Sequence, residues 1–194
     1  AAWEKRIRNA ILYDDKELLV INKPTGLAVH GGSGVRLGLI ESLRSLLPDE
    51  RYLELVHRLD RDTSGLVMIA KNARTLRALH QQLRENRIHK RYMALVAGKW
   101  PAYQRMVSAP LDRRHTASGE RLVKVSNEGK PAKTEMRVLG RFPDATLIEA
   151  KPITGRTHQI RVHTQHIGHP ILGDNKYQID QSASRTSTAG LKRL

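Results

Sequence analysis

The sequence contains no cysteine, few aromatic residues and no long apolar run, and each scarcity narrows the possible functions. Without cysteine among its 194 residues, this sequence can form no disulfide bond, thiol nucleophile or thiolate metal site, which fits a cytoplasmic protein. No apolar run reaches the length of a membrane span. At 4% of the chain, aromatic residues are too few to favour a stacking platform for non-specific binding of single strands.

Acidic residues are also in the minority, and the resulting charge indicates a polyanionic partner. There are 34 Lys and Arg against 19 Asp and Glu, a formal net charge of +15. Nucleic acid is the commonest polyanion that such a surplus serves. An anionic membrane surface is the alternative, but no basic amphipathic helix with a bulky apolar face is evident. Charge alone therefore fits both an enzyme acting on RNA and a non-catalytic RNA-binding module.

Length and composition indicate an ordinary globular chain. At 39% apolar and 27% charged residues, it can form one core-bearing domain or two small ones sharing a sheet. Residues 1–9 are polar and basic, and we expect them to be a linker remnant. Residues 181–190 are rich in Ser, Thr, Ala and Gly, which is typical of a flexible segment. The folded domain is therefore expected within 10–194.

Apolar periodicity predicts short strands alternating with amphipathic helices. Two short apolar runs flank residues 14–17, which indicates a hairpin, and Asn72 can cap a helix running to about residue 87. Leu76, Leu79 and Leu83 would form the buried stripe of that helix. The expected strands are 10–13, 18–22, 53–56, 66–70, 91–98, 121–125, 133–139 and 145–150, and the expected helices are 39–47, 73–87 and 157–167.

The stretch 53–70 combines two apolar runs with a sharply polar centre. Residues 53–56 and 66–70 have the length and branched content of buried strands. Between them His, two Arg, two Asp, Thr and Ser crowd into residues 57–64, and the polar run stops at Gly65. A polar loop fixed at both ends by buried strands suits catalysis, because a rigid scaffold holds reactive groups at the surface. A solvated hairpin loop is the ordinary alternative.

Residues 57–65, HRLDRDTSG, closely resemble the signature H-R-L-D-x-x-T-S-G of the RluA-type pseudouridine synthases. Segments 22–26 (NKPTG), 89–96 (HKRYMALV) and 154–163 (TGRTHQIRVH) match the same family in the same order. Residues 30–34 and 119–121 look most like the RluC branch, whose substrate is large-subunit ribosomal RNA. The match covers nearly the whole chain.

The resemblance implies an α+β fold, with a mainly antiparallel mixed sheet and a central active-site cleft flanked by helices and loops. Such relatives carry a small RNA-binding domain before the catalytic one and continue into closing strands, so residues 10–194 are expected to be a catalytic domain incomplete at its C-terminus. The implied enzyme is an isomerase that turns uridine into pseudouridine, with 23S rRNA as partner and no membrane contact. A monomer is expected. Nothing is oxidised in the reaction, so no metal or other cofactor is expected.

The resemblance also assigns roles to individual residues. Asp60 matches the family's catalytic aspartate, and whether it attacks the sugar, attacks the base or removes the C2′ proton stays open. Arg161 matches the arginine that pairs with it, and Tyr92 matches the tyrosine that can stack on the uracil, although a core tyrosine is the ordinary reading. RNA binding is expected of four further residues, Arg58, Arg156, His57 and Lys90. Arg58 matches the side chain that fills the vacated base stack. Among these, His57 is expected mainly to brace the loop.

Two alternatives involve other chemistry. Histidines at 158, 163, 166 and 169 raise the question of a zinc site, but they are separated by five, three and three residues, and none of these pairs has the i, i+4 spacing of two ligands on one helix face. A base-excising glycosidase would also flip a base and use a carboxylate. That enzyme would release free uracil, whereas a pseudouridine synthase leaves the mass of the RNA unchanged.

Overall fold

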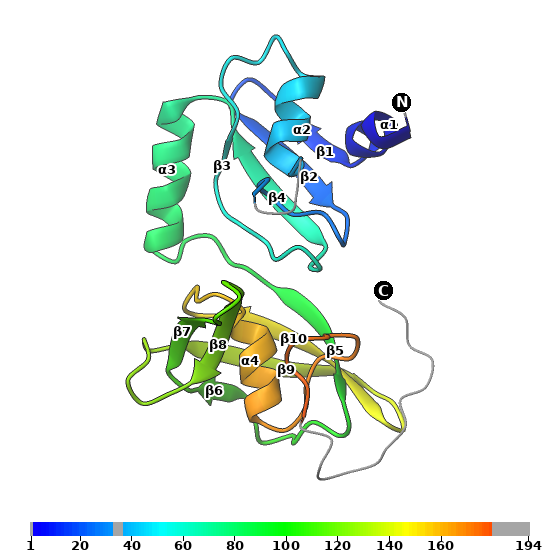
Figure 1. Cartoon of the computed structure of the whole chain (residues 1–194), viewed down its shortest axis with the longest axis vertical. Helices are drawn as coiled ribbons and strands as arrows, with labels where there is room; N and C mark the ends of the chain where they lie inside the picture. Colours follow the sequence, from blue (N-terminus) through cyan, green and yellow to red (C-terminus); the bar gives the residue numbers. More distant parts are fainter. Residues whose placement is uncertain (1, 33–36, 180–194) are drawn as a thin grey trace. The chain divides into compact units, whose positions relative to one another are not determined.

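The computed structural model describes residues 2–32 and 37–179. The chain divides into two compact units, Ala1–Ile88 and His89–Leu194. Both units contain helices and antiparallel strands, which confirms the predicted α+β class (Figure 1). The predicted flexible segment 181–190 lies outside the described residues, as does part of segment 30–34. None of the described helices has the length and apolar character that a membrane crossing requires.

The first unit is built on a four-stranded antiparallel sheet with the strand order β1-β2-β4-β3. Leu19 and Ile21 of β2 and Val67 and Ile69 of β4 are all fully buried. The β2–β4 register begins at Leu18 opposite Ala70 and ends at Lys23 opposite Gly65, so the end of β2 lies beside the end of the polar loop. The elements of this unit are α1 (Ala2–Asn9), β1 (Ile11–Asp14), β2 (Leu18–Lys23), α2 (Leu39–Leu46), β3 (Glu54–Leu55), β4 (Gly65–Ala70) and α3 (Ala73–Arg84).

Helix α1 corrects the expectation of a linker at residues 1–9. Residues 2–9 are helical, and the Ile7 side chain is 0% exposed. The helix packs against α2, where Arg8 Nη2 donates a hydrogen bond of 2.9 Å to the carbonyl of Leu46. One buried isoleucine in a polar segment makes no visible periodicity, which explains the wrong prediction.

Helix α3 follows its predicted cap but not its predicted burial. The Asn72 side chain accepts a hydrogen bond of 2.8 Å from the backbone N–H of Thr75, as expected of an N-cap. The helix ends at Arg84 rather than near residue 87. The predicted leucine stripe is only half-buried, and no residue of this helix is fully buried.

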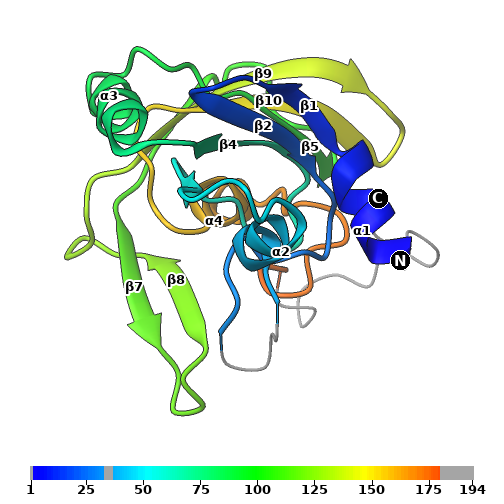
Figure 2. The same ribbon diagram turned by 90° about the horizontal axis from the view of Figure 1, so that it is seen from above.

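The second unit contains a four-stranded antiparallel sheet, with the order β5-β10-β9-β6, and a separate hairpin of β7 and β8 (Figure 2). Val96, Trp100, Val107 and Ile148 are among its buried core residues. Strands β6 and β7 were not anticipated, because their segment is basic and turn-rich. The elements are β5 (Tyr92–Ala97), β6 (Met106–Ser108), β7 (Leu111–His115), β8 (Arg121–Val125), β9 (Lys133–Arg141), β10 (Ala145–Pro152) and α4 (Gln159–His166).

Candidate active site

The polar loop between β3 and β4 is fastened to the sheet at its first residue. His57 Nε2 accepts a hydrogen bond of 3.1 Å from the backbone N–H of Met68 in β4. Further along, the N–H of Thr63 donates to the carbonyl of Asp60 at 3.1 Å and closes a turn. The Asp60 side chain is half-buried and Arg58 is exposed. These contacts agree with a bracing role for His57, and RNA binding by His57 and Arg58 stays a prediction.

A second segment, residues 24–27, is tied to the same loop. The N–H of Gly26 donates to the carbonyl of Arg61 at 2.8 Å, and Arg61 Nε donates back to the carbonyl of Gly26 at 3.1 Å. Thr25 Oγ1 donates to the carbonyl of Asp62 at 2.8 Å. Because these bonds run in both directions, the NKPTG and HRLDRDTSG segments form one assembly around Asp60.

Lys23 lies at the centre of this assembly, and sequence reasoning gave it no role. It is 0% exposed, and its Nζ donates to the carbonyls of Leu27 at 2.7 Å, Pro24 at 3.0 Å and Arg61 at 3.1 Å. Burial lowers the pKa of this ammonium to about 8, while the carboxylates of Asp62 and Asp60 oppose the shift. The side-chain period of two along β2 puts residue 23 on the same face as the buried Leu19 and Ile21, and that signal could have found it.

Lys23→Met is expected to lower the free energy of unfolding by about 2 kcal/mol, because one buried and two partly buried carbonyls lose a charged donor. Unfolded lysine titrates near 10.5 and folded Lys23 near 8, so the unfolded chain binds more protons between these values. Wild-type stability should therefore gain up to about 3 kcal/mol as the pH rises from 8 to 10.5, and the variant should lack this gain. Denaturant unfolding across that range measures both effects. Lys16→Met, at an exposed position, is the control and should change neither.

In the second unit, a buried polar network fixes the start of α4. Gln159 Oε1 accepts hydrogen bonds from Thr154 Oγ1 at 2.7 Å and from the N–H of Arg156 at 3.0 Å. Its Nε2 donates to Thr134 Oγ1 at 2.9 Å, and Thr134 Oγ1 lies 2.8 Å from Nδ1 of His163. Burial lowers the pKa of the His163 imidazole. Part of the TGRTHQIRVH motif therefore serves to hold α4 against β9.

Arg161 projects from α4 into a cluster that orients its guanidinium. Its Nε and Nη2 donate to Asp174 Oδ2 at 2.7 Å and Oδ1 at 3.1 Å, the two-bonded geometry that guanidinium favours. Its Cζ lies 4.9 Å from the ring centre of Tyr177. The Tyr177 hydroxyl is 2.6 Å from Nδ1 of His158. Arg161 is thus held in one orientation by charge, ring face and helix together.

Asp174 is a second residue that sequence reasoning missed. Its side chain is 5% exposed. Burial acts to raise the pKa of this carboxyl, but hydrogen bonds from Arg161 and from the backbone N–H groups of Lys176 and Tyr177 outweigh it and hold the pKa below 3.8. The segment before it is anchored to the strand that carries Tyr92, since the N–H of Leu172 donates to the carbonyl of Leu95 at 2.8 Å.

Tyr92, Lys90 and Arg156 also belong to this unit. Tyr92 is the first residue of β5 and is half-buried, with the small Ala94 on the same face of the strand. A Cβ added to Gly155 would lie 3.6 Å from Lys90 Nζ, so Lys90 is next to the loop that holds Arg156. Arg156 Nε donates to the carbonyl of Pro131 at 3.0 Å. The pairing of Asp60 with Arg161 and the stacking role of Tyr92 stay predictions.

Three of the four histidines of the zinc alternative have separate hydrogen-bond partners. His163 Nε2 lies 2.9 Å from the carbonyl of Ala109, and His169 Nδ1 lies 2.7 Å from the carbonyl of Ala97. His158 contacts Tyr177, as described above. Within residues 2–32 and 37–179, no three His, Asp or Glu side chains are grouped to hold a metal ion.

Solved structures show the class of protein to which this fold belongs. The chain is similar to human RNA pseudouridylate synthase domain containing 4, with a TM-score of 0.74 and 31% identity over 91% of this chain and 71% of that one. Human RNA pseudouridylate synthase domain containing 1 gives a TM-score of 0.75 and 28% identity over 90% of this chain and 71% of that one. The arrangement of helices and antiparallel strands is thus that of pseudouridine synthase domains.

Sequence comparison gives the family. Residues 17–166 match the family model described as RNA pseudouridylate synthase. The chain is 55% identical over 184 residues to ribosomal large subunit pseudouridine synthase C of Haemophilus ducreyi, covering 95% of this chain and 58% of that protein. It is 53% identical over 191 residues to the protein of the same name from Escherichia coli K12, and this match covers 97% of this chain and 60% of that protein.

The chain therefore belongs to the RNA pseudouridylate synthase family, which confirms the resemblance carried by residues 57–65. The two bacterial relatives also bear out the likeness to the RluC branch. The chain spans about three fifths of the length of these relatives.

Proposed function

We propose that this chain is the catalytic part of an isomerase that converts uridines of large-subunit ribosomal RNA into pseudouridine. The observation that carries the proposal is the environment of Asp60. It is half-buried, on a loop clamped to β4 and to residues 24–27, with the Lys23 ammonium as a nearby positive charge. The relatives named for ribosomal large-subunit pseudouridine synthesis support the substrate class.

The chemistry requires one ionised carboxylate. The N1–C1′ bond of uridine breaks, the uracil turns, a C5–C1′ bond forms, and the proton on C5 is lost as N1 gains one. Bond cleavage develops positive character at C1′, which an Asp60 carboxylate can trap or stabilise, or relieve by taking the C2′ proton. Attack of the carboxylate on the uracil is the third route. Each route needs the carboxylate form, and the Lys23 ammonium interacts electrostatically with this carboxylate.

Three further residues complete the proposed mechanism. Arg161, held by Asp174, supplies an oriented guanidinium as a counter-charge for Asp60. Tyr92 stacks on the flipped uracil, and its phenolate form accepts the C5 proton as the base regains its aromatic form. Arg58, exposed on the loop, enters the space that the flipped base leaves. Since no electrons are exchanged with an outside group, the reaction needs no redox cofactor.

The test uses large-subunit ribosomal RNA labelled with tritium at C5 of uridine. Incubation with the chain is expected to release tritium into water while the RNA keeps its mass, and a chelator should leave the rate unchanged. Free uracil in the supernatant would instead show a glycosidase. Binding without tritium release, under conditions where E. coli ribosomal large subunit pseudouridine synthase C reacts, would favour the non-catalytic RNA-binding module.

A further inference from the structure

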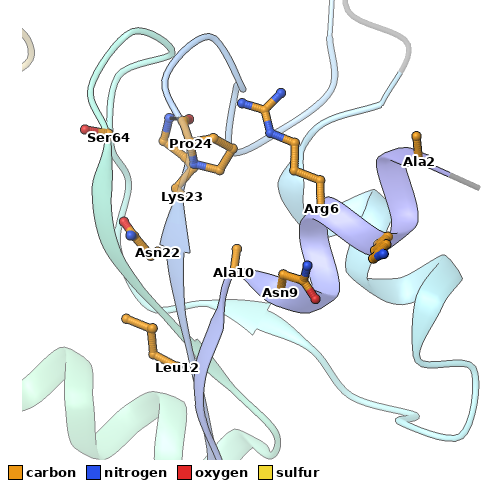
Figure 3. A pocket seen from close by; sticks show the side chains of 10 residues that line it. Ala2, Arg6, Asn9, Ala10, Leu12, Asn22, Lys23, Pro24 and Ser64 are labelled. Atoms are coloured by element: carbon orange, nitrogen blue, oxygen red, sulfur yellow. Dashed lines mark hydrogen bonds between the residues drawn. The ribbon is translucent and has the colours of Figure 1, made fainter. Parts of the chain in front are cut away.

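The first unit contains an open groove that the proposed catalytic residues do not use. Its volume is about 590 Å³, and it lies between α1, β1 and the end of β2. Figure 3 shows the Arg6 side chain extending from α1 toward Pro24, where β2 ends. A groove of this size can enclose a small charged or polar ligand segment. The polar residues that line it are Lys5, Arg6, Asn9, Asn22, Lys23 and Ser64.

The walls of the groove are fixed. Helix α1 is anchored by the fully buried Ile7 and by the hydrogen bond from Arg8 to the carbonyl of Leu46. At the base of the groove, the N–H of Asn22 donates to the carbonyl of Ala10 at 2.8 Å. The binding surface is therefore already formed, so binding of a ligand costs little entropy for ordering the protein.

The exposed charges that line the groove are basic. Lys5 and Arg6 are exposed on α1, and neither forms a salt bridge with another residue of the described chain. Lys23 also lines the groove, and its ammonium, held by backbone carbonyls, adds positive charge beneath the surface. Two exposed cations, together with the amide and hydroxyl groups of the lining, match the oxygens of a phosphate–ribose backbone.

The groove also adjoins the catalytic loop. Lys23 pairs with Gly65 across the β2–β4 ladder, so Ser64 reaches the groove from the loop that carries Asp60 four residues earlier. An RNA strand whose target nucleotide lies at Asp60 can therefore continue past Ser64 into the groove without leaving the first unit.

We propose that this groove binds the sugar–phosphate backbone of the substrate RNA beside the target uridine, which rests on the proposed function above. The exposed lysine and arginine contact phosphates, and Asn9, Asn22 and Ser64 contact ribose or phosphate oxygens. Backbone contacts of this kind position a nucleic acid without reading its sequence. They would add affinity common to all of the enzyme's uridine targets.

The test compares two double variants that remove the same charge. Lys5→Ala/Arg6→Ala empties the groove of its exposed cations, and Arg77→Ala/Arg84→Ala removes two exposed cations from α3. Binding of a large-subunit rRNA fragment is measured as a function of salt, together with the single-turnover rate at saturating RNA. The groove variant should bind about tenfold more weakly at low salt, and its log–log salt slope should fall by about 1.5, the value for two phosphate contacts. Its saturated rate should stay near wild type, and the α3 variant should change less on every measure.

Three results would overturn the proposal. Equal losses in the two variants would mean general charge attraction. Unchanged RNA affinity in the groove variant, including the case where an acidic protein binds there instead, would remove the RNA site. An intact affinity with a fallen saturated rate would place the cations in chemistry rather than in binding. Failure of the proposed function looks different, because wild type would then form no pseudouridine while the groove variant still lost RNA affinity.

Discussion

Asp60→Asn is expected to abolish pseudouridine formation while the variant still binds RNA. Asparagine has nearly the shape of aspartate but no negative charge, so it can neither trap C1′ nor take the C2′ proton. We expect the single-turnover rate to fall by at least about a thousandfold, the scale seen when a group essential to covalent catalysis is lost. Tritium release reports the rate, and filter binding reports the affinity for RNA.

The matched control is Asp62→Asn, which removes the same charge two residues away. Asp62 is exposed, and it contributes its backbone carbonyl to the loop through Thr25, which the substitution leaves in place. Both carboxylates act on Lys23, so a purely electrostatic role would affect the two variants alike. Activity of Asp60→Asn within tenfold of wild type, or equal losses in both variants, would contradict the assignment.

Asp174→Asn is expected to slow the reaction by about ten- to a hundredfold, because a buried charge pair loses one partner and Arg161 loses its orientation. The Asp174 carboxylate receives two hydrogen bonds from Arg161 and is almost fully buried. The variant should also be destabilised by about 3 kcal/mol. Since folding lowers the pKa of Asp174, this contribution is present above about pH 4 and is lost as the pH falls through the folded-state pKa.

A double-variant cycle separates positioning from general stability. If Asp174 acts through Arg161, the rate losses of Asp174→Asn and Arg161→Lys should be far from additive. Asp112→Asn is the control, since Asp112 accepts a hydrogen bond of 2.8 Å from Arg114 on an exposed strand and should alter neither rate nor cycle. Additive rate losses, with stability alone affected by Asp174→Asn, would reduce Asp174 to a structural ion pair.

Features set by neighbouring residues were predictable from the sequence. The Asn72 cap, the hairpin of β1 and β2 and the strand β5 each depend on local chemistry, and each forms as predicted. The family signature also located the candidate loop. Helix α1 was missed because only one residue of this polar segment, Ile7, is buried, and a single apolar position gives no periodicity.

The supporting residues were not predictable in the same way. Lys23 became interpretable only when folding brought carbonyls from residues 24, 27 and 61 to one nitrogen. Asp174 lies 13 residues after Arg161 in a turn-rich segment, where no periodicity connects them. A sequence shows which residues could react, whereas the groups that orient them come from tertiary contacts.

The hydrogen bonds of Lys23 connect three separate segments of the chain. A single nitrogen holds Pro24 at the groove, Leu27 beyond it and Arg61 next to the catalytic aspartate. Pulling any one of these segments away would take a hydrogen-bond acceptor from a largely buried ammonium, so we expect the three segments to move together. A displacement of Pro24, at the end of the groove where RNA is proposed to lie, would therefore act on the turn that carries Asp60.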